Sequence, residues 1–542
     1  MTTRTFRFRR FGPGLLSAVL LAGTACSPSY YREDADEEVY SVVSQKQAKA
    51  LGAADDGFTI ERPEGALRER LEAPQAATNE PITLGLVAAL ETAAANSRDF
   101  ARNRETVYLA ALDLTLDRHD FAVRYFDSGT AEIAADDDTD EVTGSVDNSF
   151  SIVRSLETGG QIALSLGTSL FRIITSPTEN SASSILSLAI TQPLLRGAGK
   201  AVATENLTQS ERSAIYAVRT FERFKQELAV RVASGYFRVL QAIDAVENER
   251  ANYGNAEEAL RRTESLARAG RLPQFQVDQA KQNELTARES VINAEESYNA
   301  QIDSFRFTLG LPPDSNVDLD RSELEKLVAG GLTDSAVAAE EAVRIAVAKR
   351  LDLMNSRDQA EDATRRIAVA ENALEMGLDL VAGASWGTTN NRPGAFEFGE
   401  GRYSIGLDFD LPLDRKAQRN AYRAALIEAE RRRRDMIEAE DSVKIDVRDA
   451  LRNLRQARES YEIQKTSVGL ARTTIDSTTL FLQAGRADTR DLLDAQRDLL
   501  RAQNSLTRAL VSHEISLLEL SRDMGTLQVD DTGLSYEIKL KD

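Results

Sequence analysis

Apolar residues recur at alternating steps of four and three over two long stretches of the chain, Lys200–Gly310 and Ala417–Gly525. This is the coiled-coil period, and it predicts long helices that pack through apolar stripes. An Ala-Gly-Arg tripeptide interrupts each stretch once, and the two tripeptides lie 215 residues apart. The same offset relates the stripe Leu228, Val232, Gly235, Val239, Ala242 and Val246 to Val443, Val447, Ala450, Leu454, Ala457 and Tyr461. The chain is therefore an internal duplication.

Each half also contains segments in which apolar and polar residues alternate. Such segments have one apolar and one polar face, as strands of a membrane β-barrel do, although a soluble β-hairpin has the same pattern. Four strands cannot close a barrel, and open sheet edges are not tolerated in lipid, so the chain is expected to oligomerise. The periodicity leaves the number of subunits open. The expected strands are Gln161–Ile174, Ile185–Gln192, Leu378–Trp386 and Tyr403–Leu411.

The segment Phe121–Gly160 has no counterpart in the second half. Its acidic cluster lacks the spacing of a defined calcium loop, so the segment is interpreted as a solvated acidic loop. The cluster consists of Asp136, Asp137, Asp138 and Asp140.

Two further helical segments precede the strands, Ile82–His119 in the first half and Ala336–Leu374 in the second. The helices predicted over Lys200–Ala269 and Ala417–Ala484 would each be about 100 Å long at 1.5 Å per residue. Two shorter helices stacked end to end match one such length. Each half is therefore expected to combine a strand hairpin with a column of coiled-coil helices, closed by a tight turn at the tripeptide glycine.

The first ten residues form a basic region. It is followed by the apolar core Leu15–Ala22 and by the small residues Gly23 to Ala25, just ahead of Cys26. This order predicts an export signal. Its end resembles the bacterial lipoprotein signal, which implies that Cys26 is acylated. Gly23 departs from that signal, in which leucine is preferred, and ordinary cleavage after Ala25 is the alternative. Since Cys26 is the only cysteine, no disulfide within the chain is possible.

The composition excludes several classes of function. A formal net charge of −20 argues against nucleic-acid binding, which needs clustered basic residues. Only two histidines occur, His119 and His513, and they suggest no metal site. No phosphate-binding loop, nucleophile elbow or catalytic triad spacing is present, so neither an enzyme nor a cofactor is expected.

These observations predict the following organisation. The boundaries are a signal peptide over 1–25, an N-terminal tether over 26–80, a first structural repeat over 81–314, a linker over 315–332, a second repeat over 333–527 and a C-terminal tail over 528–542.

A resemblance to a known family is carried by the segments ITQPLLRG and FDLPLDRK, the Ala-Gly-Arg turns and the run AGRADTRDLLDAQRDLLRAQNSLTRAL. Over roughly Pro81–Leu527, the chain resembles the TolC-like outer-membrane efflux proteins. The resemblance implies a mainly α protein with a membrane β-barrel, in which a homotrimer forms a twelve-stranded barrel continued by a periplasmic α-helical tunnel. It also implies a periplasmic adaptor (membrane fusion) protein and an inner-membrane transporter as partners. The expected protein is a lipid-anchored outer-membrane exit channel of a tripartite efflux or type I secretion system.

The family closes its tunnel with acidic residues in the motif D-x-x-D-A, which implies that Asp491 and Asp494 form a periplasmic gate. The first half has only Asp278 in the equivalent stretch, and the alternative for each aspartate is a solvated surface charge. The resemblance also assigns adaptor contact to two turns that could instead be plain hairpin turns. Their residues are Ala269, Gly270 and Arg271, and Ala484, Gly485 and Arg486.

One competing function remains, that of a periplasmic coiled-coil adaptor or structural protein without a pore. The apolar faces of the expected strands argue against it, because such a protein has no lipid to cover them. The sequence does not indicate which substrate is exported.

Overall fold

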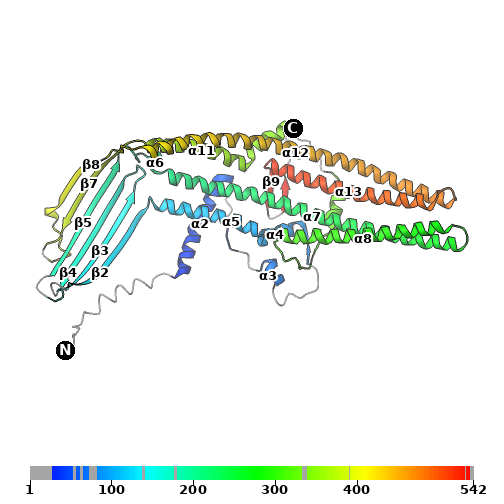
Figure 1. Cartoon of the computed structure of the whole chain (residues 1–542), viewed down its shortest axis with the longest axis horizontal. Coiled ribbons are helices and arrows are strands. Elements are labelled where there is room, and N and C mark those ends of the chain that lie inside the picture. The colour runs from blue at the N-terminus through cyan, green and yellow to red at the C-terminus, as the bar shows by residue number, and fades with distance from the viewer. Residues whose placement is uncertain are drawn as a thin grey trace, which may run out of the picture. The chain divides into compact units, whose positions relative to one another are not determined.

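The computed structural model describes residues 27–52, 57–61, 65–72, 82–136, 141–175, 180–332, 338–389, 391–530 and 533–536. Its contacts divide the chain into two compact units (Figure 1). The sheet unit comprises the residues up to Thr59, Val107–Val218 and Leu378–Phe409, and the helix unit comprises Ile60–Thr106, Arg219–Gly377 and the residues from Asp410 onward.

The sheet unit is built on one six-stranded sheet in the order β2-β3-β4-β5-β7-β8. The four strands expected from the sequence are present as β4, β5, β7 and β8. The expectation that they are the whole sheet is wrong, because β2 and β3 occupy the segment interpreted as a solvated loop. Asp136 ends β2, and the other three aspartates of the cluster lie outside the described residues. The strands are β2 (Val123–Asp136), β3 (Glu141–Ser155), β4 (Gln161–Ile173), β5 (Asn180–Pro193), β7 (Gly377–Gly387) and β8 (Arg402–Asp410).

One helix of the sheet unit comes from the segment predicted to be a tether. The short helix expected near Glu37–Leu51 is longer, as α2 (Pro28–Leu51), and it buries Val39, Val42 and Val43. Lys46 is only 2% exposed and binds Glu211, which also accepts a hydrogen bond from Arg118 at 2.7 Å. Burial acts to raise the pKa of Glu211, but the hydrogen bonds from Lys46 and Arg118 outweigh it and lower the pKa.

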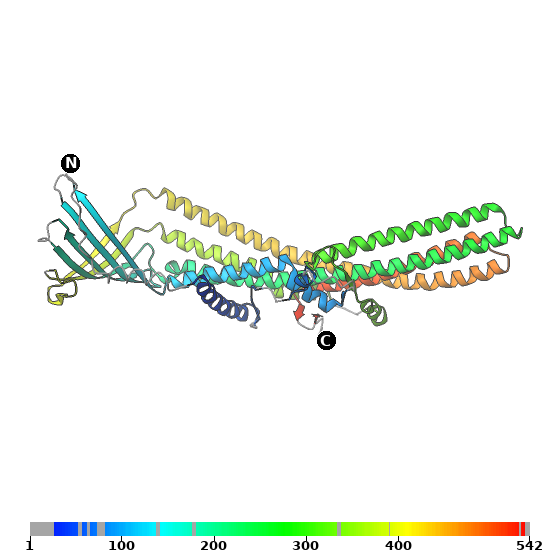
Figure 2. The ribbon, with the colours of Figure 1, turned by 90° about the horizontal axis from the view of Figure 1, so that it is seen from below.

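Two long helical hairpins dominate the helix unit (Figure 2). The first consists of α7 (Glu205–Arg268) and α8 (Gln274–Thr308), and the second of α12 (Lys416–Gln483) and α13 (Thr489–Asp523). The predicted stripes are confirmed, since most of their members are buried. The buried members are Leu228, Val232, Val239 and Val246 in α7 and Val443, Val447, Ala450, Leu454, Ala457 and Tyr461 in α12.

The shorter helical segments of both repeats are broken at equivalent positions. In the first repeat, Ser97 separates α4 (Leu86–Asn96) from α5 (Arg98–His119). In the second repeat, Arg350 separates α10 (Ala339–Lys349) from α11 (Leu351–Asn372). Each break contacts a glycine with positive φ, Gly310 in the first repeat and Gly525 in the second.

The segments predicted as linker and tail contain regular structure. The linker carries β6 (Val317–Leu319), which pairs in parallel with β1 (Ile82–Leu84), and α9 (Ser322–Gly330). The tail forms a ribbon of β9 (Leu527–Asp530) and β10 (Gly533–Tyr536). Among the described residues, the remaining short elements are α3 (Leu67–Glu72), α6 (Lys200–Ala203) and η2 (Phe398–Glu400).

None of the helices in the described part of the chain combines the length and the hydropathy of a membrane-spanning segment.

Candidate gate and docking turns

The turn between α7 and α8 is closed by two backbone hydrogen bonds. The amide of Gly270 donates to the carbonyl of Ala267 and that of Arg271 donates to the carbonyl of Leu266, both at 2.9 Å. Gly270 has a φ of 71°, the left-handed conformation that ends many helices. A side chain at this position would be strained, which explains why the tripeptide carries glycine.

The turn between α12 and α13 repeats this geometry. The amide of Arg486 donates to the carbonyl of Phe481 at 2.8 Å, that of Gly485 donates to Leu482 at 3.1 Å, and Gly485 has a φ of 69°. Both turns lie at the same end of the helix unit (Figures 1 and 2). The six residues predicted to contact an adaptor are all exposed: Ala269, Gly270, Arg271, Ala484, Gly485 and Arg486.

Large apolar side chains next to both turns are also exposed. Phe275, in the first turn of α8, is 64% exposed, and Leu480 and Phe481, in the last turn of α12, are 65% and 52% exposed. Sequence reasoning missed these residues, although two aromatic residues within a few positions of a predicted turn are a usable signal. Exposed apolar groups beside polar ones are typical of protein-binding surfaces.

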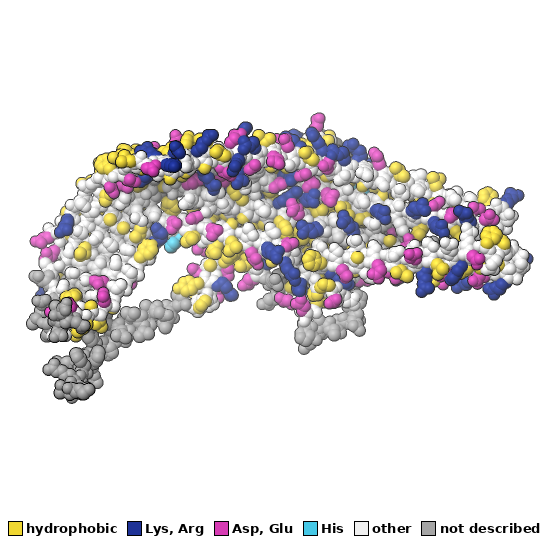
Figure 3. Space-filling model, in the orientation of Figure 1, with side chains coloured by type: hydrophobic (Ala, Val, Ile, Leu, Met, Phe, Trp, Pro, Cys, Tyr) yellow, Lys and Arg dark blue, Asp and Glu magenta, His cyan; other side chains and the backbone are white. Residues whose placement is uncertain are grey.

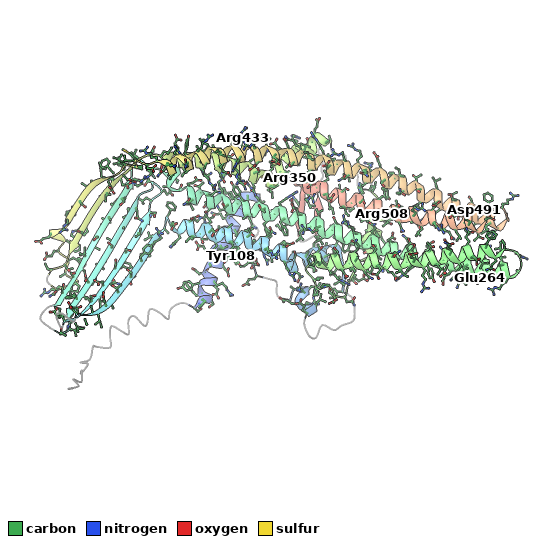
Figure 4. All side chains as sticks on the ribbon, in the orientation of Figure 1. Tyr108, Glu264, Arg350, Arg433, Asp491 and Arg508 are labelled. Carbon is green, nitrogen blue, oxygen red and sulfur yellow. The ribbon has the colours of Figure 1, made fainter. Side chains whose placement is uncertain are left out.

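Asp491 has a structural contact that the sequence analysis did not assign. It is the third residue of α13, and its carboxylate accepts a hydrogen bond of 2.9 Å from the amide of the N-cap residue Asp488. The Asp488 side chain caps the helix in return, so the two form a capping box. Asp491 remains exposed near the end of its hairpin (Figure 4).

Asp494 follows one helical turn later and lies between two arginines. Its carboxylate is 3.7 Å from Nε of Arg490 and 3.5 Å from a terminal nitrogen of Arg497. Arg497 also donates to the side chain of Asn283 in α8, at 3.2 Å from its Nε. The two predicted gate residues therefore come together on one helix, and part of their charge is offset within the chain.

The first repeat lacks this arrangement. The positions equivalent to Asp491 and Asp494 are Gln276 and Gln279, and the N-cap residue Pro273 makes no side-chain cap. Asp278 is exposed and accepts a hydrogen bond of 3.3 Å from Gln274. Over the two hairpins, positive and negative side chains are interspersed (Figure 3). The acidic pair is thus a local feature of the second turn.

The histidines build no metal site. His513 is 2% exposed, and burial, followed by the charge of Arg458, lowers its pKa, so its side chain is neutral at pH 7. Within the described residues, no group of three or more His, Cys, Asp or Glu side chains could hold a metal ion.

The family model described as "Outer membrane efflux protein" matches residues 161–311 and 342–526. Because these ranges make up more than half of the sequence, the chain belongs to the outer membrane efflux protein family. The match begins at Gln161, the first residue of β4, so β2 and β3 precede it.

Known proteins similar to the chain belong to the same class. The chain is 25% identical over 336 residues to the outer membrane protein TolC of Vibrio cholerae, a match that covers 60% of the chain and 74% of the relative. CusC superposes with a TM-score of 0.58 at 14% identity, covering 86% of the chain and 98% of CusC. The outer membrane channel CmeC of Campylobacter jejuni superposes with a TM-score of 0.57 at 13% identity, covering 81% and 85%.

The predicted TolC-like fold and membership of a channel family are thus confirmed. Because the family and these neighbours are outer-membrane channels, the prediction that the chain is not an enzyme is confirmed too.

Proposed function

We propose that the chain is the outer-membrane exit channel of a tripartite efflux or type I secretion system. Three copies form a passive duct, an inner-membrane transporter supplies the energy, and a periplasmic adaptor binds the Ala-Gly-Arg turns. The observation that carries this proposal is the two-faced sheet. Such a sheet needs lipid on one side and water on the other, which a pore-less coiled-coil adaptor does not offer.

The two faces are continuous from strand to strand in the register of the sheet. The face of the sheet that is visible in Figure 3 is mostly white, the colour of the backbone and of uncharged polar side chains. Exposed apolar residues of β8 alternate with polar ones, and Ile405 is 79% exposed. One apolar row reads Tyr125, Ile152, Leu164, Leu188 and Ala384. One polar row reads Ser151, Ser165, Ser187 and Ser385, and its member in β2 is Phe126.

The gate of the proposed channel is the pair Asp491 and Asp494. In a trimer, three copies of the pair place six carboxylates around the pore, which attract cations and repel one another. Arg490 and Arg497 reduce this repulsion and so allow the ring to close. The turns that precede the gate expose backbone and aromatic groups, which supports their assignment to the adaptor.

The proposed membrane anchor is an acylated Cys26. This residue lies outside the described residues, and α2 begins two positions later, at Pro28. Intact mass spectrometry of the mature protein tests the anchor, since an unmodified N-terminus contradicts it. Cys26→Ser should leave the channel folded, because the sheet itself holds the protein in the membrane.

Single-channel recording in a planar bilayer tests the function and the gate together. Asp491→Asn with Asp494→Asn removes both charges, and the amide oxygen of the first replacement can still accept the capping hydrogen bond. We expect a higher conductance, with weaker cation selectivity and weaker divalent block. The matched control is Asp278→Asn in the other hairpin, which should change little. A purified protein that never conducts contradicts the function, and equal effects of variant and control contradict the gate.

A further inference from the structure

The hairpin of β2 and β3 is a full part of the membrane sheet. Every residue of β2, from Val123 to Asp136, pairs with a residue of β3, and Thr143–Ser155 of β3 pair with β4. Both strands are as long as the four strands that the sequence predicted. The hairpin is therefore not an appendage of a four-stranded sheet.

The hairpin also continues the two faces of the sheet. On the apolar face, Ile133 lies opposite Gly144, and Val146 lies opposite Leu170 of β4. On the polar face, a hollow of about 290 Å³ indicates the concave side, and most of its lining comes from small polar residues. The polar-face residues that line it include Ser128, Thr130, Asp147, Ser149, Ser169 and Ser183. A concave polar face continuing onto β2 fits the lumen of a barrel.

The two ends of the hairpin lie side by side. Val123 at its start lies opposite Arg154 at its end, so the two backbones are about 5 Å apart there. The second repeat has no counterpart of the hairpin, since α11 ends at Asn372 and β7 already begins at Gly377. The hairpin is thus an insertion relative to the second repeat, and it adds two strands beside β4.

We propose that β2, and not β4, forms the seam with β8 of a neighbouring copy of this chain. Three copies of six strands then close a barrel of eighteen strands in place of twelve. This inference rests on the proposed trimeric channel. Since barrel diameter grows roughly linearly with strand number, the lumen is about 1.5-fold wider than that of a twelve-stranded barrel.

Two features of the sheet support this seam. An open edge such as β2 is not tolerated in lipid, so another strand must pair with it. Each strand from β2 to β7 runs antiparallel to its neighbour, and Figure 1 shows β8 running opposite to β7. Strands β2 and β8 therefore run in opposite directions, and their pairing between two copies is antiparallel like the rest of the sheet.

Disulfide cross-linking tests the seam, because Cys26 is the only native cysteine and Cys26→Ser gives a clean background. Cysteines at opposed positions of paired strands are close enough to bridge. Ser404→Cys in β8 is combined with one cysteine at a time in β2, and in a matched set with one cysteine at a time in β4. The β2 positions are Phe126, Ser128, Thr130 and Glu132, and the β4 positions are Ala163, Ser165, Gly167 and Ser169.

We expect covalent trimers with at least one β2 position and with none of the β4 positions. Cross-links from β4, or from neither strand in a conducting trimer, overturn the proposal and leave the channel function intact. A mass of the native assembly that corresponds to two copies also overturns the proposal, since two copies of six strands make a twelve-stranded barrel. A monomer without conductance contradicts the proposed function itself.

A deletion variant sharpens the test. Removing residues 124–153 joins the neighbouring ends of the hairpin and makes β4 the edge strand. Ser404→Cys should then cross-link to β4, through Ser165→Cys or another position of the same set. Failure of this cross-link in a deletion variant that still assembles and conducts would count against the insertion. The full-length set decides the question if the deletion variant does not fold.

Discussion

The two repeats carry the same helical hairpin, but they differ in what their side chains do at its ends. Both turns place a glycine at positive φ, in Gly270 and Gly485, and close it with the same backbone hydrogen bonds. Only the second repeat follows its turn with a capping box and an acidic pair. The comparison teaches that the duplication has preserved what the backbone requires and varied what faces solvent or a partner.

The junctions at the other ends of the hairpins differ in a similar way. In the first repeat Ser97 accepts a hydrogen bond of 3.4 Å from the amide of Phe100. In the second repeat Arg350 takes the equivalent place and binds Asp352 at 2.6 Å and Asp446 at 2.8 Å. One junction therefore depends on close backbone packing and the other on buried charge.

The largest effect is expected from Gly310→Ala. The new Cβ would overlap the carbonyl oxygen of Asn96. Residue 310 also has a φ of 75°, which a side chain strains. We expect a loss of about 3 kcal/mol or more in the free energy of unfolding, from strain and overlap together. The matched change, Gly525→Ala, meets its nearest atom at 3.2 Å and should cost about 1–2 kcal/mol. Equal midpoints in denaturant unfolding would show that the junctions are packed alike.

A smaller effect is expected from Arg350→Ala. The Arg350 side chain is 8% exposed, while Asp352 and Asp446 are 43% and 44% exposed. Because water partly solvates both carboxylates, we expect a loss of about 1–3 kcal/mol, below that of a fully buried pair. Ser97→Ala should cost less than about 1 kcal/mol, since its hydrogen bond is long. Measuring the unfolding midpoints of Arg350→Ala and Ser97→Ala compares the two losses.

The second junction should also depend on pH. Burial acts to raise the pKa of Asp352, but hydrogen bonding and charge from Arg350 outweigh it and lower the pKa. A lowered folded-state pKa contributes stability above the unfolded value of about 3.9, and this contribution is lost as the pH falls through the folded value. The stability of Asp352→Asn should therefore vary less below pH 4 than that of the wild type. Unfolding midpoints across this range that fall equally in both proteins would contradict the assignment.

The smallest effect on stability is expected from moving the acidic pair. Gln276→Asp with Gln279→Asp gives the first repeat the charges of the second, at two half-buried positions. Surface changes of this kind usually stay within about 0.5 kcal/mol. Cation selectivity in the planar bilayer should nevertheless rise, because three more pairs of carboxylates enter the same region. If selectivity stays unchanged, the two turns do not face one pore.

The long helices could be predicted closely because their signal is repeated many times. Helix α12 ends at Gln483, one residue before the predicted end, and α7 ends at Arg268, also one residue before. Neither the breaks at Ser97 and Arg350 nor their role as junctions could be seen, since helical periodicity continues across both. Those breaks depend on contacts with Gly310 and Gly525, which lie far away in the sequence.

The strands β2 and β3 were missed for a different reason. Their alternation is present, with Val142, Val146, Phe150 and Ile152 on one face. Many small polar residues and the acidic tip weaken the signal, and the second repeat offers no counterpart for comparison. In the candidate site, the spacing of Asp488 and Asp491 matches a capping box and could have been recognised. The contact of Arg497 with Asn283 could not, because it joins two distant helices.

Two of the side-chain hydrogen bonds that join the hairpins share one chemical trait. The side chain of Asn248 donates to Asn504 at 2.8 Å, and the hydroxyl of Thr507 donates to Asp244 at 2.7 Å. Each contact has an uncharged member, so dissolved ions screen it only weakly, whereas they screen pairs of opposite charges at a surface strongly. In a cell envelope that follows the salinity of its surroundings, these two hydrogen bonds would therefore persist in dilute and in concentrated media alike.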